Sequence, residues 1–571
     1  MSVFFNGRLL VSPTVASVVD DSALANRNLS VGNVVALVGR SSGGQPNTAL
    51  AFGSPSEAAA VLRDGELLTA VQKAFDPSAQ TGGPATVIAV RVNPATQAAL
   101  ALLDGAAATV INLQSTDYGL WNNQIKVKIE AATTAGRKVT TQVGNNYYSQ
   151  DDVSRNAMTV RYTGAAASAQ MTVNGTTLTL AAPTGTTVAT VDLATYPTVQ
   201  QVVDRINVVT GFTAVVLDGN GNAPTLQGLD FVTAQDVKTA TYTATAHLQA
   251  IVDWLNGVGE GFVTATRPSN VGTLPAVLPF TYLAGAVDGT VTNTEWSNAF
   301  TVLQSSDVQW VVPVSSDPSI HAMADAHVAF MSNVGRMERR AICGTPAGTS
   351  DAAAIVLAKA LNSDRTSLVH IGYYDYNAAG ALTLYPPYLL AALLAGAFSG
   401  VNPGTALTNK TIKVRGLERK LRNPTDTDAL INGGILAVEE TTSGFKVVKS
   451  VSTWLTNDNY NRVEVSTGVA LDFVARNVRQ ALDVLRGEKG NALTLSRAKS
   501  IVTGTLTELA RQEPQGPGVL AGNDANPAFR SIAVALEGDV LRVEFQCSPV
   551  IPVNYCLVSI FAVPFSASVT A

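Results

Sequence analysis

The segment Gly39-Arg40-Ser41-Ser42-Gly43 matches the G-x-S-x-G pattern that carries the nucleophile of many hydrolases. In those enzymes the serine lies on a sharp turn between a strand and a helix. Here Gly44-Gln45-Pro46-Asn47 follow directly, and these residue types favour a loop. The segment also lacks the Lys-Ser/Thr pair of a P-loop and the G-x-G-x-x-G of a dinucleotide site. We therefore interpret it as a Gly/Ser loop without a chemical role.

Histidines and a tyrosine cluster are the other candidates for a chemical site. His321 and His327 would point in different directions from a helix, and His321 with Asp325 on one helix face is too few groups for a metal site. No residue pattern around His247 or His370 indicates a catalytic or metal-binding partner. Tyr373-Tyr374-Asp375-Tyr376 follows a predicted strand, where aromatic side chains more often fill a core or an interface than stack on a ligand. The sequence predicts no catalytic residue, no metal ligand and no cofactor.

A predicted helix over 468–486 carries three arginines, Arg476, Arg479 and Arg486, beside an apolar stripe. Asp472 and Asp483 lie one turn from arginines, which is typical of a solvated helix face. A docking surface for an acidic partner is the alternative interpretation, and the sequence leaves both open. The stripe consists of Leu471, Val474, Val478, Leu482 and Leu485.

Both ends of the chain predict strands that have no partner nearby in the sequence. Val15, Ser17 and Val19 alternate with their neighbours at strand periodicity, and residues 555–563 are almost all apolar. Such a tail needs both faces covered, so we expect it to be buried in a sheet. The strands either join the chain's own sheets or pair with other copies, because an unpaired strand edge is a template for another chain. The candidate residues for pairing between copies are Val15, Ser17, Val19, Tyr555, Leu557, Ser559 and Phe561.

The composition favours contact with other protein chains. Charged residues are only 14% of the chain, against 46% hydrophobic residues, which leaves little polar surface for a free monomer. The net charge is -5 and no basic block stands out, so a nucleic-acid partner is not expected. Cys343, Cys547 and Cys556 form no CxxC pair, which favours a reducing compartment. The start resembles no secretory signal, and the most apolar stretch, 388–398, is too short to cross a bilayer and predicts a buried helix.

The order of predicted elements indicates a chain of several domains. Strands and helices alternate over 31–92 and again over 280–415, which implies βαβ units and a partly parallel sheet. Short alternating runs rich in Thr, Val and Gly fill 100–270, including a hairpin at Asn174-Gly175. The predicted fold class is α+β / α/β multidomain, with mixed-sheet core domains, an inserted mostly-β outer domain and extended terminal β-arms. The predicted domains are an N-terminal arm (1–25), a discontinuous α/β domain (26–100 plus 271–415), the inserted domain (101–270), an α+β domain (416–546) and a C-terminal arm (547–571).

Several segments in order resemble the contractile-tail sheath proteins of bacteriophages. They are VVALVGRSSGG from Val34 with NTALAFGSPSEAAAVLRDGELLTAVQKAF after it, Val90-Arg91-Val92-Asn93-Pro94, STDYGLWNNQI over 115–125, and GLERKLRNPTDTDALINGGILAVE with VEVSTGVALDFVARNVRQAL over 416–482. Together they cover about half of the chain. None of these motifs is diagnostic alone, but their order matches that of the family.

The resemblance implies a structural protein, not an enzyme, that polymerises as stacked rings around an inner tail tube and contracts to drive the tube through a bacterial envelope for genome delivery. It implies a tube-facing C-terminal domain, arms exchanged between copies, and a basic surface toward the tube that would map to Arg476, Arg479 and Arg486. The implied partners are further copies, the tail tube protein, and baseplate and tail-terminator proteins, without nucleic acid or membrane insertion. The implied location is the virion tail, assembled in the host cytoplasm. A pyocin-like or secretion-system sheath, a surface adhesin and an α/β enzyme are the alternatives.

Overall fold

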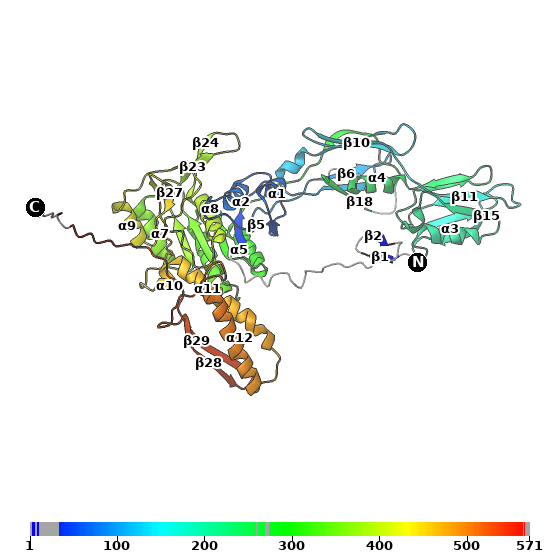
Figure 1. Ribbon diagram of the computed structural model, residues 1–571. Coiled ribbons are helices and arrows are strands. Elements are labelled where there is room, and N and C mark those ends of the chain that lie inside the picture. The colour runs from blue at the N-terminus through cyan, green and yellow to red at the C-terminus, as the bar shows by residue number, and fades with distance from the viewer. Residues whose placement is uncertain are drawn as a thin grey trace, which may run out of the picture.

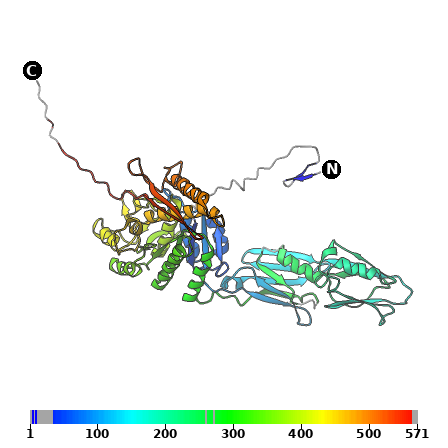
Figure 2. The ribbon, with the colours of Figure 1, turned by 90° about the horizontal axis from the view of Figure 1, so that it is seen from below.

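The computed structural model describes residues 3–5, 8–10, 34–257, 261–268, 273–562 and 565. An α/β body lies at one end of these residues, and a run of β-rich modules projects from it (Figure 1). The helical pair α11–α12 and the hairpin β28–β29 project from the body in another direction, and the C-terminal segment leaves it on the side away from the modules (Figures 1 and 2). None of the described helices is long and apolar enough to cross a membrane.

The body is built on one six-stranded sheet with the order β22-β21-β20-β3-β5-β4. Its strands are parallel except β4, which runs antiparallel to β5. The predicted apolar helix is α8 (Pro387–Gly400), which is buried along almost its whole length against α2 and the sheet. The other elements are β3 (Val34–Gly39), β4 (Ala49–Phe52), α1 (Pro55–Leu62), α2 (Glu66–Phe75), β5 (Thr86–Arg91), α5 (Asn293–Val302), η3 (Leu303–Ser305), β20 (Trp310–Pro313), α6 (Pro318–Asn333), β21 (Arg340–Gly344), α7 (Asp351–Leu361) and β22 (Thr366–Val369).

Local capping signals explain where the helices of the body begin. The Ser54 hydroxyl accepts from the Glu57 amide at the start of α1, with Pro55 in the first turn, as the sequence predicts. Asp317 caps α6 in the same way, and Pro318 follows it. These signals are short in range, and the predicted helix starts are confirmed.

The chain leaves the body after β5 and returns before α5, and the residues between form two modules with separate hydrophobic clusters. The proximal module packs the sheets β10-β9-β8-β19 and β18-β7-β6 around α4. Its cluster includes Leu283 and Ala286, so it extends past residue 270, where the sequence predicted the insertion to end. Its elements are β6 (Ala99–Leu103), β7 (Thr109–Ser115), η1 (Leu120–Gln124), β8 (Lys126–Ala131), β9 (Arg137–Val143), β10 (Asn146–Val153), α4 (His247–Gly257), β18 (Val263–Thr266) and β19 (Leu278–Tyr282).

The distal module contains the sheets β15-β11-β17 and β14-β13-β12-β16, with α3 packed on its core. The predicted hairpin is confirmed: β12 and β13 pair antiparallel around Asn174-Gly175. The helix α3 begins in a capping box at Thr198 and Gln201. Its elements are β11 (Asn156–Tyr162), β12 (Gln170–Val173), β13 (Thr177–Ala181), β14 (Thr187–Asp192), α3 (Val199–Asn207), β15 (Phe212–Val216), η2 (Asn220–Asn222), β16 (Val232–Asp236) and β17 (Tyr242–Thr245).

The last third of the described chain divides between the body and a smaller core. Leu430, Ile435 and Val447 belong to the hydrophobic cluster of the body, which therefore runs past residue 416, where the sequence predicted a new domain. A separate cluster joins α11, α12 and the hairpin β28–β29. The elements are β23 (Tyr373–Tyr376), β24 (Leu382–Tyr385), β25 (Gly416–Leu417), α9 (Thr425–Asn432), β26 (Val438–Thr441), β27 (Gly444–Val447), α10 (Tyr460–Val463), α11 (Val465–Leu482), η4 (Asp483–Leu485), α12 (Ala492–Ala510), β28 (Phe529–Glu537) and β29 (Val540–Cys547). A short pair, β1 (Val3–Phe5) and β2 (Arg8–Leu10), is antiparallel.

Candidate functional site

The motifs that could have carried chemistry are held in structural contacts. Ser41 is buried, and its hydroxyl donates to the Gly43 carbonyl at 2.8 Å. His321 contacts the Ser315 carbonyl at 2.9 Å, and His370 contacts Asp351 at 2.8 Å. Across the described ranges, no three His, Cys, Asp or Glu side chains gather as a metal site would require. The loop interpretation of the G-x-S-x-G segment is thus confirmed by the position of its serine.

The C-terminal segment is the most exposed apolar stretch among the described residues. It is tethered up to Asn554, whose amide donates to Glu464 Oε2 at 3.1 Å and whose side-chain oxygen accepts from Thr408 at 3.0 Å. Beyond that point it extends away from the body (Figure 1). Leu557 is 95% exposed and Phe561 is 88% exposed.

These residues form no strand within the described chain, so the expectation that they are buried in one of its own sheets is wrong for the single chain. Tyr555, Leu557, Ser559 and Phe561 lie in this exposed segment. Val15, Ser17 and Val19 lie outside the described residues.

The hairpin β28–β29 is a two-stranded sheet, so neither of its outer edges pairs with another strand among the residues that the structure describes. One face of it, with Ile532, Val543 and Phe545, packs toward the cluster of α11 and α12. The hairpin is therefore held in place on one face by its own chain, while its edges keep free backbone donors and acceptors.

Two of the three predicted arginines, Arg476 and Arg479, lie on α11 and are bound inside the chain. Arg476 Nη1 lies 2.8 Å from Asp307, and its side chain is 9% exposed. Arg479 Nη2 lies 2.5 Å from Glu338 Oε1, while Arg476 Nε lies 3.4 Å from Oε2 of the same carboxylate. The predicted positive surface at these two residues is thus largely neutralised by carboxylates on the segments before β20 and β21.

Asp472 corrects the prediction of a solvated helix face. It does not pair with Arg476 one turn away; it accepts from Arg340 and Arg365 at 3.1 Å each, and both of these belong to the body. We call this set of contacts, from Asp472 to Arg479 on α11 and their partners on the body, the ionic seam. These contacts fix α11 to the part of the body around the start of β21, where the paired carboxylate and arginine side chains lie.

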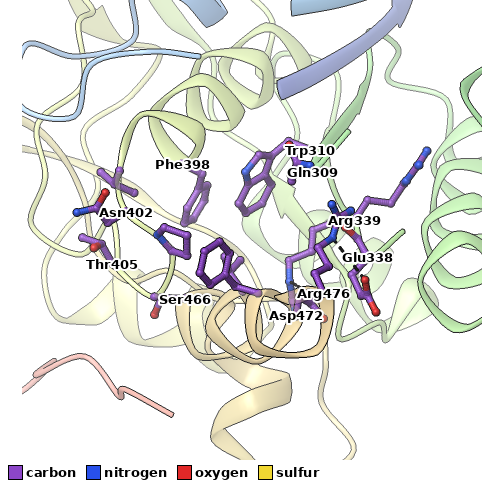
Figure 3. A pocket seen from close by; sticks show the side chains of 16 residues that line it. Gln309, Trp310, Glu338, Arg339, Phe398, Asn402, Thr405, Ser466, Asp472 and Arg476 are labelled. Carbon is purple, nitrogen blue, oxygen red and sulfur yellow. Dashed lines mark hydrogen bonds and ion pairs between the residues drawn. The ribbon is translucent and has the colours of Figure 1, made fainter. Parts of the chain in front are cut away.

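A small cavity lies beside the ionic seam, between α8, α11 and β20 (Figure 3). The rings of Trp310 and Phe398 stack at 4.6 Å along one side of it. Its volume is about 40 Å³, which is room for water but not for an organic ligand. We therefore assign it to packing between the body and α11.

Burial shifts the proton affinity of the groups behind the seam. Desolvation and, to a smaller extent, the neighbouring Arg339 cation together lower the pKa of His327 to about 4. The pKa of Arg339 falls to about 10, because its guanidinium is also desolvated and lies near Arg476. Arg339 Nη1 donates to His327 Nε2 at 3.1 Å, which requires the neutral imidazole. This pair is a structural contact that depends on a deprotonated histidine.

Arg486 is placed differently from the other two arginines. Its side chain is 83% exposed at the turn between α11 and α12, and it forms an ion pair with Asp483 on the same turn. Lys489, Arg497 and Lys499 are also exposed on this turn and on the first half of α12. We call Arg486, Lys489, Arg497 and Lys499 the basic turn. The sequence analysis identified only Arg486. Lys489, Arg497 and Lys499 lie beyond the predicted helix over 468–486, whose apolar stripe defined the helix face.

Arg91 is a structural residue that the chemical search of the sequence missed. It is fully buried at the end of β5, and its guanidinium donates to the carbonyls of Gly44 (2.8 Å) and Tyr118 (3.1 Å) and to Asp288 (3.0 Å). Tyr118 lies on the loop between β7 and η1 of the proximal module, and Asp288 lies on the segment that returns from this module to α5. Arg91 therefore joins a loop of the proximal module and the returning segment to the body, and we call this contact set the Arg91 clamp.

No family model matches the chain. A search of curated proteins finds the tail sheath protein of Bacillus phage SP01, 28% identical over 585 residues that cover 100% of this chain and 98% of the relative. The putative tail sheath protein of Enterococcus phage phiEF24C is 28% identical and covers 95% of each chain. The tail sheath protein of Staphylococcus phage Twort is 24% identical and covers 84% of this chain and 86% of its own.

Solved structures give the same comparison at the level of the fold. The sheath tail protein from Desulfitobacterium hafniense matches with a TM-score of 0.55 at 13% identity, covering 95% of this chain and 99% of its own. The sheath tail protein from Listeria innocua also has a TM-score of 0.55, at 14% identity, covering 91% of this chain and 92% of its own. The mixed α/β architecture with several sheets is therefore one that sheath tail proteins share.

Proposed function

This chain is a homologue of bacteriophage tail sheath proteins over its whole length, and we propose that it is the structural subunit of a contractile tail sheath. The resemblance drawn from the sequence is confirmed by these relatives. The match over nearly the full length of the curated relatives is the observation that carries the proposal. The subunit has no catalytic role: its relatives are structural proteins by name, and its serine and histidines are bound in packing contacts.

In this proposal the subunits polymerise around an inner tail tube and shift from an extended to a contracted lattice, which drives the tube through the bacterial envelope. The sheath belongs to the virion tail and assembles in the host cytoplasm. Baseplate and tail-terminator proteins lie at the two ends of the sheath. The energy comes from packing formed at assembly, so no nucleotide and no cofactor is needed.

The links between copies are terminal strands that complete sheets in neighbouring subunits. The exposed apolar segment at Tyr555, Leu557, Ser559 and Phe561 supports this, because such a surface is not stable in water by itself. The free edges of β28–β29 offer backbone partners for it. The N-terminal arm, with Val15, Ser17 and Val19, is proposed for the same role on the basis of its strand periodicity.

The surface toward the tube is proposed to be the basic turn instead of the middle of α11. Arg486 stays in the proposal because it is exposed. Arg476 and Arg479 contribute by holding α11 on the body through the ionic seam. An acidic tube surface would then meet the exposed charges at the end of the α11–α12 pair.

Electron microscopy of the purified full chain tests the proposal. We expect tubes of stacked rings to form without a ligand. Deleting 555–571 should leave a folded chain that does not polymerise, as judged by circular dichroism and sedimentation velocity. Tubes of normal length from this truncation, or from one lacking residues 1–20, would contradict arm exchange.

A sheath from a phage-derived particle, such as a pyocin-like or secretion-system sheath, would use the same subunit design and is the second candidate. A surface adhesin or an α/β enzyme has less support, because the relatives that cover the whole chain are tail sheath proteins.

A further inference from the structure

The sheet β10-β9-β8-β19 of the proximal module has one face that no other described part of the chain covers. Val127, Ile129 and Val139 point to the module core. The alternate residues of the same strands therefore lie on the outer face. Exposed aromatic rings gather there: Tyr147 is 54% exposed, Phe280 38% and Tyr282 57%. In a chain with only 6% aromatic residues, such a grouping on one face calls for a partner.

The register places these rings at both edges of the face. Tyr147 pairs with Gln142, Gln142 pairs with Lys126, and Lys126 pairs with Tyr282, so one row crosses all four strands. Three strand spacings make this row roughly 14 Å long. The next row holds Ser149, Thr140 and Lys128; Thr140 is buried, with its hydroxyl 2.8 Å from that of Ser149. The two rows thus present rings at the edges, the Gln142 amide and lysine ammonium groups between them, and the exposed Ser149 hydroxyl beside Tyr147.

The charge of this face is positive. Lys128 and Lys138 share one carboxylate, that of Glu130, at 2.7 and 3.8 Å. The Lys126 ammonium lies 4.8 Å from the centre of the Phe280 ring, and no described carboxylate comes within ion-pair distance of it. A second carboxylate, Asp151, also interacts with Glu130 and Lys138. The three lysines therefore exceed the two acids by one positive charge, and Lys126 lies next to the exposed rings.

We propose that this face, formed by Tyr147, Gln142, Lys126, Lys128, Phe280 and Tyr282, binds an anionic polysaccharide. Sugar rings stack their C–H faces on aromatic side chains, while hydroxyl and amide groups bond their oxygens and ammonium groups neutralise their acidic substituents. The row is long enough for more than one sugar ring. A protein partner fits less well, because lysines and a serine lie among the rings, and these residue types are depleted in protein interfaces. The proposal is independent of sheath assembly.

The test measures binding of the full chain to immobilised polygalacturonate, with neutral dextran and polyglutamate as the comparison polymers. We expect retention on polygalacturonate that weakens with salt. The double variant Tyr147→Ala/Tyr282→Ala should lower the affinity at least about fivefold, since two stacking contacts are lost. Lys126→Ala should weaken binding and reduce its salt dependence.

Matched controls are Tyr460→Ala and Lys359→Ala, which change exposed residues of the same types on the body and should bind like the original chain. Unchanged binding by the double tyrosine variant would overturn the proposal. Equal binding to polyglutamate would show that charge alone is recognised, and equal binding to dextran would show that the lysines play no part; either result also overturns it.

Discussion

At the level of single residues, the ionic seam shows how buried charges can serve attachment within a chain. Glu338 is 6% exposed and receives both Arg476 and Arg479. The buried Glu338 carboxylate is stabilised only while its arginine partners remain, and the arginines likewise depend on the carboxylate.

Replacing Glu338 by Gln should therefore destabilise the body by about 3 kcal/mol, because Arg476 would lose a buried counter-charge. Denaturant unfolding followed by tryptophan fluorescence would measure the change, since Trp310 lies beside the seam. The matched control is Glu508→Gln, whose partner Arg511 is 56% exposed. That change should cost no more than about 0.5 kcal/mol. Equal effects of the two changes would show that the seam is no stronger than a surface pair.

The buried histidine behind the seam predicts a loss of stability in acid. The pKa of His327 is lowered to about 4 in the folded chain, against 6.5 for an exposed imidazole. Below pH 6.5 the unfolded chain takes up the proton first, so stability falls as pH falls from about 6.5 to about 4. The full effect amounts to about 3 kcal/mol. Thermal melting between pH 7 and pH 4 would measure it, and the slope should become shallower in His327→Gln. An unchanged slope in that variant would assign the acid sensitivity to other groups.

At the level of elements, variants of the C-terminal segment allow folding and assembly to be tested separately. Leu557 and Phe561 contact little of their own chain. The double variant Leu557→Asp/Phe561→Asp should keep the circular dichroism and melting temperature of the original chain but fail to form tubes, because two charges would enter the interface between copies. Sedimentation velocity and electron microscopy would check both parts. Val356→Asp, a change at a 64% exposed apolar residue on α7, is the control and should still polymerise.

The sequence predicted those elements whose signals are local. Ser54 and Pro55 lie next to the helix that they start, and Asn174-Gly175 lies inside its own hairpin, so both were visible as short patterns. The partners of Asp472 were not, because Arg340 and Arg365 lie more than 100 positions away in the chain. The tail at Leu557 was misjudged because its apolar run indicated burial in a sheet, whereas none of the described sheets covers it.

At the level of the whole molecule, the separate hydrophobic clusters predict that the distal module can be removed. The Ala246 amide donates to the Arg155 carbonyl at 2.9 Å, so the two strands that connect the distal module are paired at this point. A chain in which Asn-Gly replaces residues 156–245 could close this pair with a tight turn.

We expect the shortened chain to fold and to polymerise, because the clusters of the body and the proximal module remain complete. Its tubes should be thinner in electron micrographs, and one thermal transition should disappear in calorimetry. Aggregation of the shortened chain alongside a stable isolated 155–246 fragment would show that the body depends on the distal module. Failure of both pieces to fold would show that the clusters are not independent.

The Arg91 clamp has a mechanical consequence for a subunit of this shape. A loop of the proximal module and the segment that returns from it are both bound to the end of β5 by one buried guanidinium, so the proximal module follows the body when the body turns. The modules project far from the sheet that carries the clamp (Figure 2). Because the modules extend far from the body, a small rotation of the body moves the far end of the distal module over a much larger distance.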